Sequence, residues 1–96
     1  MDGLNPAMGR VAFSKAGRDK GKIFIVVGII NEDFVLIADG DLRPMERPKK
    51  KRLKHLKYTE FTAGAIAEKL KTGARLANAE LREAIREIRE SLLQEG

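Results

Sequence analysis

Short hydrophobic segments separated by polar turns make up the first part of the chain. The hydrophobic segments predict strands over 8–13, 22–30 and 34–38, and β-branched residues dominate the second of them. The second segment is hydrophobic at nearly every position, so we expect both of its faces to be covered for part of its length. The polar run at 31–33 is typical of a hairpin turn between the second and third strands.

A segment at 47–57 mixes cations with isolated leucines and predicts one or two further short strands. Leu53 and Leu56 are three positions apart, so a regular strand would point them to opposite faces. We therefore expect a bulge or a single helical turn near His55.

After the last of these segments, hydrophobic residues recur at the spacing of an α-helix. A short helix is expected over 63–70, with Thr62 as its cap and a break at 72–73. Asn78 is a favourable N-cap for a second helix, and Glu80 suits the first turn of that helix because the positive end of the helix dipole lies there.

The second helix carries one hydrophobic stripe at helical spacing. The stripe consists of Leu81, Ala84, Ile85, Ile88 and Leu92. We expect it to pack on the strands. The alternatives are that it docks another protein or associates with a second copy of the chain.

These patterns predict a mainly β chain with C-terminal α structure: a small, partly open β-barrel followed by a helical extension. A barrel suits short strands because closure removes exposed edges. We place the boundary between 1–59, the barrel, and 60–96, the helical extension. Ninety-six residues suit one small unit with such an appendage.

Positive charge is concentrated in the first half of the chain. The net charge is +5, but residues 1–58 hold 13 Lys and Arg against 7 Asp and Glu, whereas 59–96 hold 6 against 7. Within 43–57 there are 8 cations and one acid, Glu46. Such an asymmetry is typical of a protein that binds a polyanion.

A second basic feature is the six-residue stretch from Gly17 to Lys22, between the first two predicted strands. Its glycines, Gly17 and Gly21, permit the positive φ that a tight reversal requires. Its three cations would lie at the tip, where an anionic partner could approach.

Catalytic, metal-binding and membrane functions find no support in the residues. The chain has no cysteine, and His55 has cations beside it but no recognisable nucleophile. Asp39 and Asp41 flank a glycine and are explained by turn chemistry. No cofactor motif, transmembrane segment or signal peptide is recognised, so we expect a cytoplasmic protein with no enzymatic activity, metal, cofactor or membrane partner.

The aromatic residues favour one mode of polyanion binding over another. Phe13, Phe24 and Phe34 fit the hydrophobic core, so no stacking platform for single-stranded nucleic acid is evident. A structured RNA, recognised by its shape and its phosphates, fits the basic segments better than a sequence motif does.

The basic loop and its flanking strands resemble a KOW motif. The matching residues are Gly9-Arg10-Val11, then Ala16-Gly17-Arg18-Asp19-Lys20-Gly21-Lys22, then Val26-Val27. In that family Gly21 would be the key glycine of the loop.

The strand at 33–37, followed by a basic run and His55-Leu56, resembles the ribosomal large-subunit protein family of the fourteen-e type. This resemblance covers about residues 8–59 and implies an SH3-like barrel that binds ribosomal RNA. The segment 60–96 looks more like the helical tail of a bacterial KOW-domain RNA-binding relative.

We therefore expect a non-catalytic, translation-associated protein that binds ribosomal or other structured RNA. The expected RNA-binding residues lie in the two basic segments and are Lys15, Arg18, Lys20, Lys22, Arg47, Lys49, Lys50, Lys51, Arg52, Lys54 and His55. The alternative is a protein-interaction module that docks on a ribosome- or transcription-associated partner. That module would use the barrel and the 78–93 helix, through Leu81, Ile85, Ile88 and Leu92.

Overall fold

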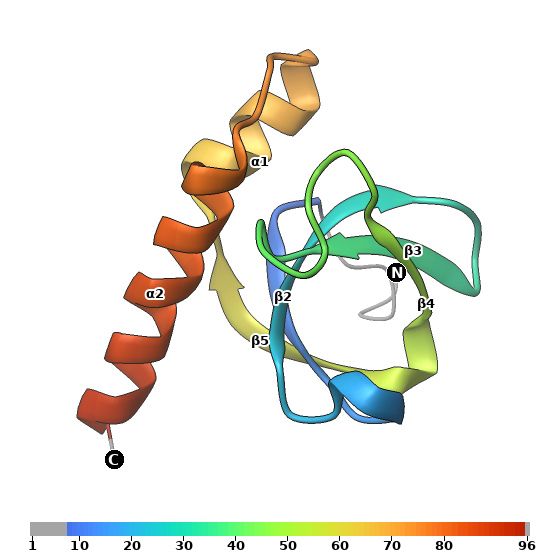
Figure 1. The fold of residues 1–96 in the computed structure, drawn as a ribbon, viewed down its shortest axis with the longest axis vertical. Helices are drawn as coiled ribbons and strands as arrows, with labels where there is room; N and C mark the ends of the chain where they lie inside the picture. The colour runs from blue at the N-terminus through green and yellow to red at the C-terminus, as the bar shows by residue number, and fades with distance from the viewer. Residues whose placement is uncertain (1–7, 96) are drawn as a thin grey trace.

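A computed structural model describes residues 8–95 of the chain. Five antiparallel strands form one sheet in the order β4-β3-β2-β1-β5. The strands are β1 (Arg10–Ser14), β2 (Ile23–Ile29), β3 (Phe34–Ala38), β4 (Lys49–Arg52) and β5 (Leu56–Thr62). The sheet curls strongly on itself (Figure 1).

Two helices, α1 (Gly64–Thr72) and α2 (Asn78–Glu95), come after the strands and lie on the outer side of the curl (Figure 1). The prediction of a mainly β chain with C-terminal helices is thus confirmed. Within residues 8–95 the edge strands β4 and β5 form no ladder with each other, so the sheet is open.

The predicted strands and turns of the first half agree closely with the structure. The turn between β2 and β3 is fixed by Asn31, whose Oδ1 accepts the backbone N–H groups of Asp33 at 2.8 Å and Phe34 at 3.0 Å. The helical turn expected near His55 is the 3-10 helix η2 (Leu53–His55), which connects β4 to β5. Short strands joined in this way let the chain pass from one edge of the curled sheet to the other.

The sheet buries hydrophobic residues on both of its faces. In β2, Phe24 and Val26 belong to one buried cluster, while Ile23, Ile25 and Val27 belong to another. The second cluster is completed by helix and connection residues, namely Ile66, Leu76, Leu81 and Ile85. The expectation that both faces of the second strand are covered is therefore confirmed.

The start of α1 differs from the prediction. Thr62 is the last residue of β5 and does not cap the helix; the N-cap is Ala63, which makes no side-chain capping bond. The β ladder to Arg10 holds Thr62 in the strand. The predicted break is confirmed, because Gly73 ends α1 with φ of 77°.

The start of α2 also differs, since Asn78 is not its N-cap. Asn78 is the first helical residue, and its Oδ1 accepts the Met45 N–H at 2.7 Å while its Nδ2 donates to Glu46 at 2.9 Å. Glu80 accepts the Ala77 N–H at 3.1 Å, which is the reach-back half of a capping box. The amide that looked like a cap instead ties α2 to the connection between β3 and β4.

The hydrophobic stripe of α2 packs on the sheet. Leu81 is fully buried and Ile85 is 5% exposed, while Ala84, Ile88 and Leu92 pack against the same cluster and are partly buried. The alternative in which Leu81 and Ile85 contact a protein partner is therefore wrong, because the sheet already covers them. Neither described helix is long and apolar enough to cross a membrane.

Candidate nucleic-acid interface

The loop between β1 and β2 is a tight, hydrogen-bonded turn. Its centre is the 3-10 helix η1 (Gly17–Asp19), and the Gly21 N–H donates to the Ser14 carbonyl at 2.8 Å. Gly17 and Gly21 have φ of 80° and 86°, as the sequence predicts. The loop exposes its cations, which are Lys15, Arg18, Lys20 and Lys22.

The acid of this loop has a role that sequence reasoning missed. Asp19 is 5% exposed, and its Oδ2 lies 2.5 Å from Lys49 Nζ in β4 and 3.8 Å from Arg43 Nη2. The hydrogen bond from Lys49 holds the pKa of the Asp19 carboxyl below its ordinary value, although burial acts in the opposite direction. Asp19 therefore fastens the basic loop to the basic strand.

Lys51 also points toward the loop and is 7% exposed. Its Nζ donates to the Ala16 carbonyl at 3.0 Å, and burial lowers the pKa of its ammonium group. Lys49 and Lys51 alternate along β4 with exposed residues, so they share the face that meets the loop. Both direct their charge to partners inside the molecule.

The exposed residues of β4 form a different arrangement. Lys50 Nζ lies 4.5 Å and the Arg52 guanidinium carbon 4.8 Å from the centre of the Phe34 ring. Phe34 is the direct cross-strand neighbour of Arg52 and is only partly buried. The assignment of Phe34 to the core is therefore wrong, whereas Phe24 is 1% exposed and does belong to it.

The remaining predicted residues lie around η2 and the connection that precedes β4. Lys54 and Arg47 are exposed, and His55 is partly buried. The His55 carbonyl accepts the Lys15 N–H at 2.7 Å, which joins η2 to the loop. Lys57, exposed at the start of β5, adds a cation that was not among the predicted binding residues.

The two basic segments are thus joined in space, although about thirty positions separate them. Three contacts connect them: Lys15 to His55, Ala16 to Lys51 and Asp19 to Lys49. The exposed cations of both segments can therefore act on one extended polyanion. Among the described residues, no group of three or more potential ligand side chains is arranged to hold a metal ion.

Two proteins of known name are similar to the chain. It is 32% identical to the large ribosomal subunit protein eL14 of Staphylothermus marinus over 85 residues, which cover 84% of the chain and 86% of that protein. The chain belongs to the eL14 family. It is also 30% identical to YbzG of Bacillus subtilis, named as a candidate ribosome-binding protein, over 71 residues that cover 74% of the chain and 96% of that protein. No family model matches the chain.

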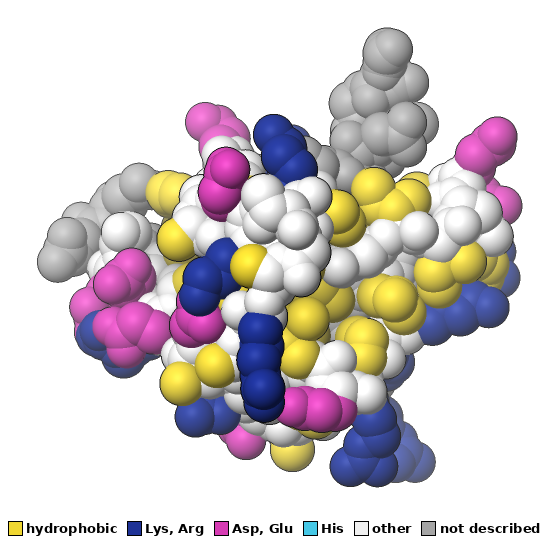
Figure 2. Space-filling model, turned by 90° about the horizontal axis from the view of Figure 1, so that it is seen from above, with side chains coloured by type: hydrophobic (Ala, Val, Ile, Leu, Met, Phe, Trp, Pro, Cys, Tyr) yellow, Lys and Arg dark blue, Asp and Glu magenta, His cyan; other side chains and the backbone are white. Residues whose placement is uncertain are grey.

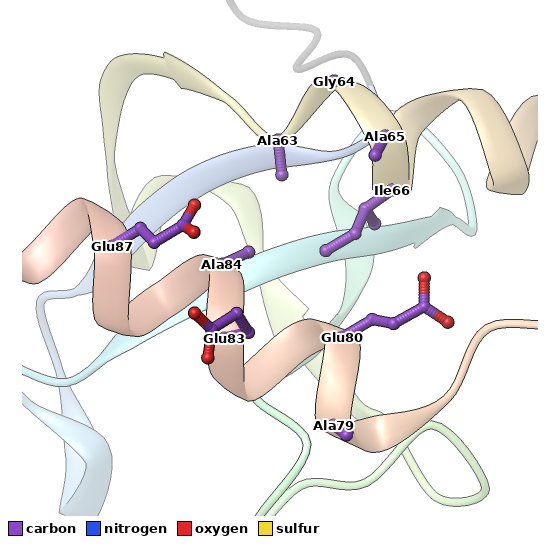
Figure 3. A pocket seen from close by; sticks show the side chains of 9 residues that line it. All are labelled: Ala63, Gly64, Ala65, Ile66, Ala79, Glu80, Glu83, Ala84 and Glu87. Atoms are coloured by element: carbon purple, nitrogen blue, oxygen red, sulfur yellow. The ribbon is translucent and has the colours of Figure 1, made fainter.

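In this member of the eL14 family, the side of the molecule that carries the helices differs from the basic surface in its side chains. Figure 1 places α1 and α2 across the sheet from β4. A pocket between the two helices has a hydrophobic floor that includes Ile66 and Ala84, and its rim carries Glu80, Glu83 and Glu87 (Figure 3). Glu80 pairs with Lys69 and Glu83 pairs with Arg86, so these cations of the helical side are already bound by carboxylates.

The surface at the end of the molecule where α1 lies carries charges of both signs and is not predominantly basic. Figure 2 shows hydrophobic side chains across this face, with Lys and Arg scattered among Asp and Glu. This face therefore lacks the single sign of charge that attracts a polyanion. The surface built by the loop and β4 remains the candidate interface.

Proposed function

We propose that this protein is a non-catalytic RNA-binding protein that binds ribosomal RNA and acts on or within the ribosome. The observation that carries the proposal is the joining of the two basic segments by buried contacts, above all Asp19 with Lys49. The names of its relatives, a large ribosomal subunit protein and a candidate ribosome-binding protein, support the same partner.

We also propose that the curled sheet is an SH3-like barrel of the KOW type. Its support is the strand order, in which a meander from β1 to β4 is followed by a 3-10 turn that returns the chain to β1 as β5. Gly17 and Gly21 are exposed and have no side chain, which suits an approach by phosphate groups to the loop backbone.

We divide the cations of the interface into two groups by the partners that they bind. Lys49 and Lys51 hold the loop against β4, because their ammonium groups bind Asp19 and Ala16. The exposed cations contact phosphates. They are Lys15, Arg18, Lys20, Lys22, Arg47, Lys50, Arg52, Lys54 and Lys57.

Co-sedimentation with purified ribosomal subunits tests the proposal. The wild-type protein should sediment with a subunit at low salt and be released by nuclease digestion of the RNA. The double variants Arg18→Ala/Lys20→Ala and Lys50→Ala/Arg52→Ala should each bind more weakly. Lys71→Ala/Arg75→Ala, which removes the same charge from exposed positions at the end of α1 and after it, should bind as the wild type does.

Two results would contradict the proposal. One is equal binding by all three double variants, since the basic surface would then have no part in recognition. The other is a complex that survives both nuclease and high salt, which would indicate a protein partner instead of RNA.

A further inference from the structure

A shallow hollow lies beside the basic loop, at the end of β1. Its volume is about 530 Å³, and the residues that line it are Phe13, Ser14, Lys15, Lys20, Gly21 and Lys57. They come from β1, the loop and β5. The hollow thus sits within the interface but is built differently from the rest of it, because it combines an aromatic residue with cations.

Phe13 forms the hydrophobic part of this hollow. It lies between Ile23 of β2 and Lys57 of β5 in the sheet register, and it packs against the buried cluster beneath the helices. It is nevertheless only partly buried, so part of its ring is accessible from the hollow. The packing against this cluster holds the ring in place before any ligand arrives.

Three lysines line the hollow together with Phe13. Lys57 is the direct cross-strand neighbour of Phe13, Lys15 is two residues further along the chain, and Lys20 comes directly after η1. Among the described side chains, no carboxylate lies within ion-pair distance of any of these three lysines. Their charge is therefore available to an anion from outside.

Gly21 leaves one wall of the hollow open. A Cβ atom at this position would have no heavy atom within 4 Å, so the space in front of the glycine is unfilled. An aromatic ring, an open wall and several cations are the features that an unpaired nucleotide requires: a surface on which its base stacks and charges for its phosphates.

We propose that this hollow accepts one unpaired base of the bound RNA, stacked on Phe13, with the flanking phosphates held by Lys15, Lys20 and Lys57. This inference rests on the proposed RNA-binding function and adds a ligand class to it, namely an unpaired nucleotide within a structured RNA. It gives Phe13 a role in recognition in addition to its place at the edge of the core.

The test compares two hairpin RNAs with the same stem. One has a loop of adenine nucleotides, and the other has the same loop with abasic sugars, so that the phosphates are equal and only the bases differ. The wild-type protein should bind the abasic hairpin about tenfold more weakly, as expected for the loss of one stacked base.

Two leucine variants add a matched comparison. Phe13→Leu keeps a hydrophobic side chain but loses the stacking surface, and it should bind the adenine hairpin about tenfold more weakly while its affinity for the abasic hairpin is unchanged. Phe61→Leu makes the same change at a partly buried residue that packs on the same cluster but does not line the hollow, and it should bind both hairpins as the wild type does.

The outcomes separate this inference from the proposed function. Equal wild-type affinity for the two hairpins would overturn the stacking site and leave RNA binding intact. Failure of the wild type to bind either hairpin would count against both. Because the comparison of hairpins needs only the wild-type protein, it decides the question even if Phe13→Leu folds poorly.

Discussion

Asp19 is the residue on which the geometry of the interface depends most. It is an acid within a basic loop, and its carboxylate is nearly buried beside Lys49 and Arg43. An isolated acid in a basic loop has no periodic signal, so the sequence alone suggests only a solvated turn residue. Its partner in β4 becomes apparent once the sheet brings the strand beside the loop.

We expect Asp19→Asn to lower the free energy of unfolding by about 1–3 kcal/mol at neutral pH, because the variant removes a charged hydrogen-bond partner from a nearly buried site. Urea denaturation measures this difference. Asp41→Asn, at an exposed position, is the control and should have little effect.

The difference between wild type and Asp19→Asn should depend on pH with a definite sign. The pKa of Asp19 in the folded protein lies below the ordinary value of 3.8, so ionisation favours the folded state. The stabilisation is fully present well above that value and is lost as the pH falls through the lower pKa of the folded protein. A difference that grew on acidification would contradict the role given to this carboxylate.

The backbone conformation of the loop depends on Gly21. Its φ of 86° is unfavourable for any residue with a Cβ atom, although the space around it is open. We expect Gly21→Ala to destabilise the protein by about 1–2 kcal/mol through backbone strain alone. Gly64→Ala, at the open first turn of α1, should be neutral or stabilising by up to about 1 kcal/mol. Equal thermal stability of the two variants would show that the loop does not need its glycine.

At the scale of elements, hydrophobic periodicity and turn chemistry predict the local structure well. The continuous hydrophobic run of β2, the Asn31 turn and the stripe of α2 all lie where these patterns indicate. Local patterns do not predict the contacts of residues whose side chains bind segments far away in the sequence. Asn78 has the chemistry of a cap, but its amide contacts the connection at Met45 and Glu46, which no local pattern reveals.

The packing of α2 on the sheet can be tested with two leucines of this helix. Leu81 is fully buried beneath the helix, whereas Leu93 on the same helix is 76% exposed. We expect Leu81→Ala to cost about 2–5 kcal/mol and Leu93→Ala less than about 0.5 kcal/mol in unfolding experiments. Similar losses for both variants would mean that α2 does not pack on the sheet as described.

At the scale of the whole molecule, opposite sides of the curled sheet's exterior serve different purposes (Figure 1). The helices complete the hydrophobic core and carry glutamates at their own pocket, while the loop, β4 and η2 gather cations. The charge asymmetry in the sequence predicts that the first half carries the interface. It does not predict that Lys49 and Lys51 turn inward, since only the curl of the sheet decides which face of β4 meets the loop.

The salt dependence of RNA binding tests the central claim most directly. If about five to eight phosphates are neutralised, the logarithm of the affinity should fall against the logarithm of salt concentration with a slope of about −4 to −7. Lys50→Ala/Arg52→Ala should reduce the magnitude of that slope by about 2, since each exposed cation accounts for about one unit. A wild-type affinity indifferent to salt, or a slope that the double variant leaves unchanged, would contradict the account.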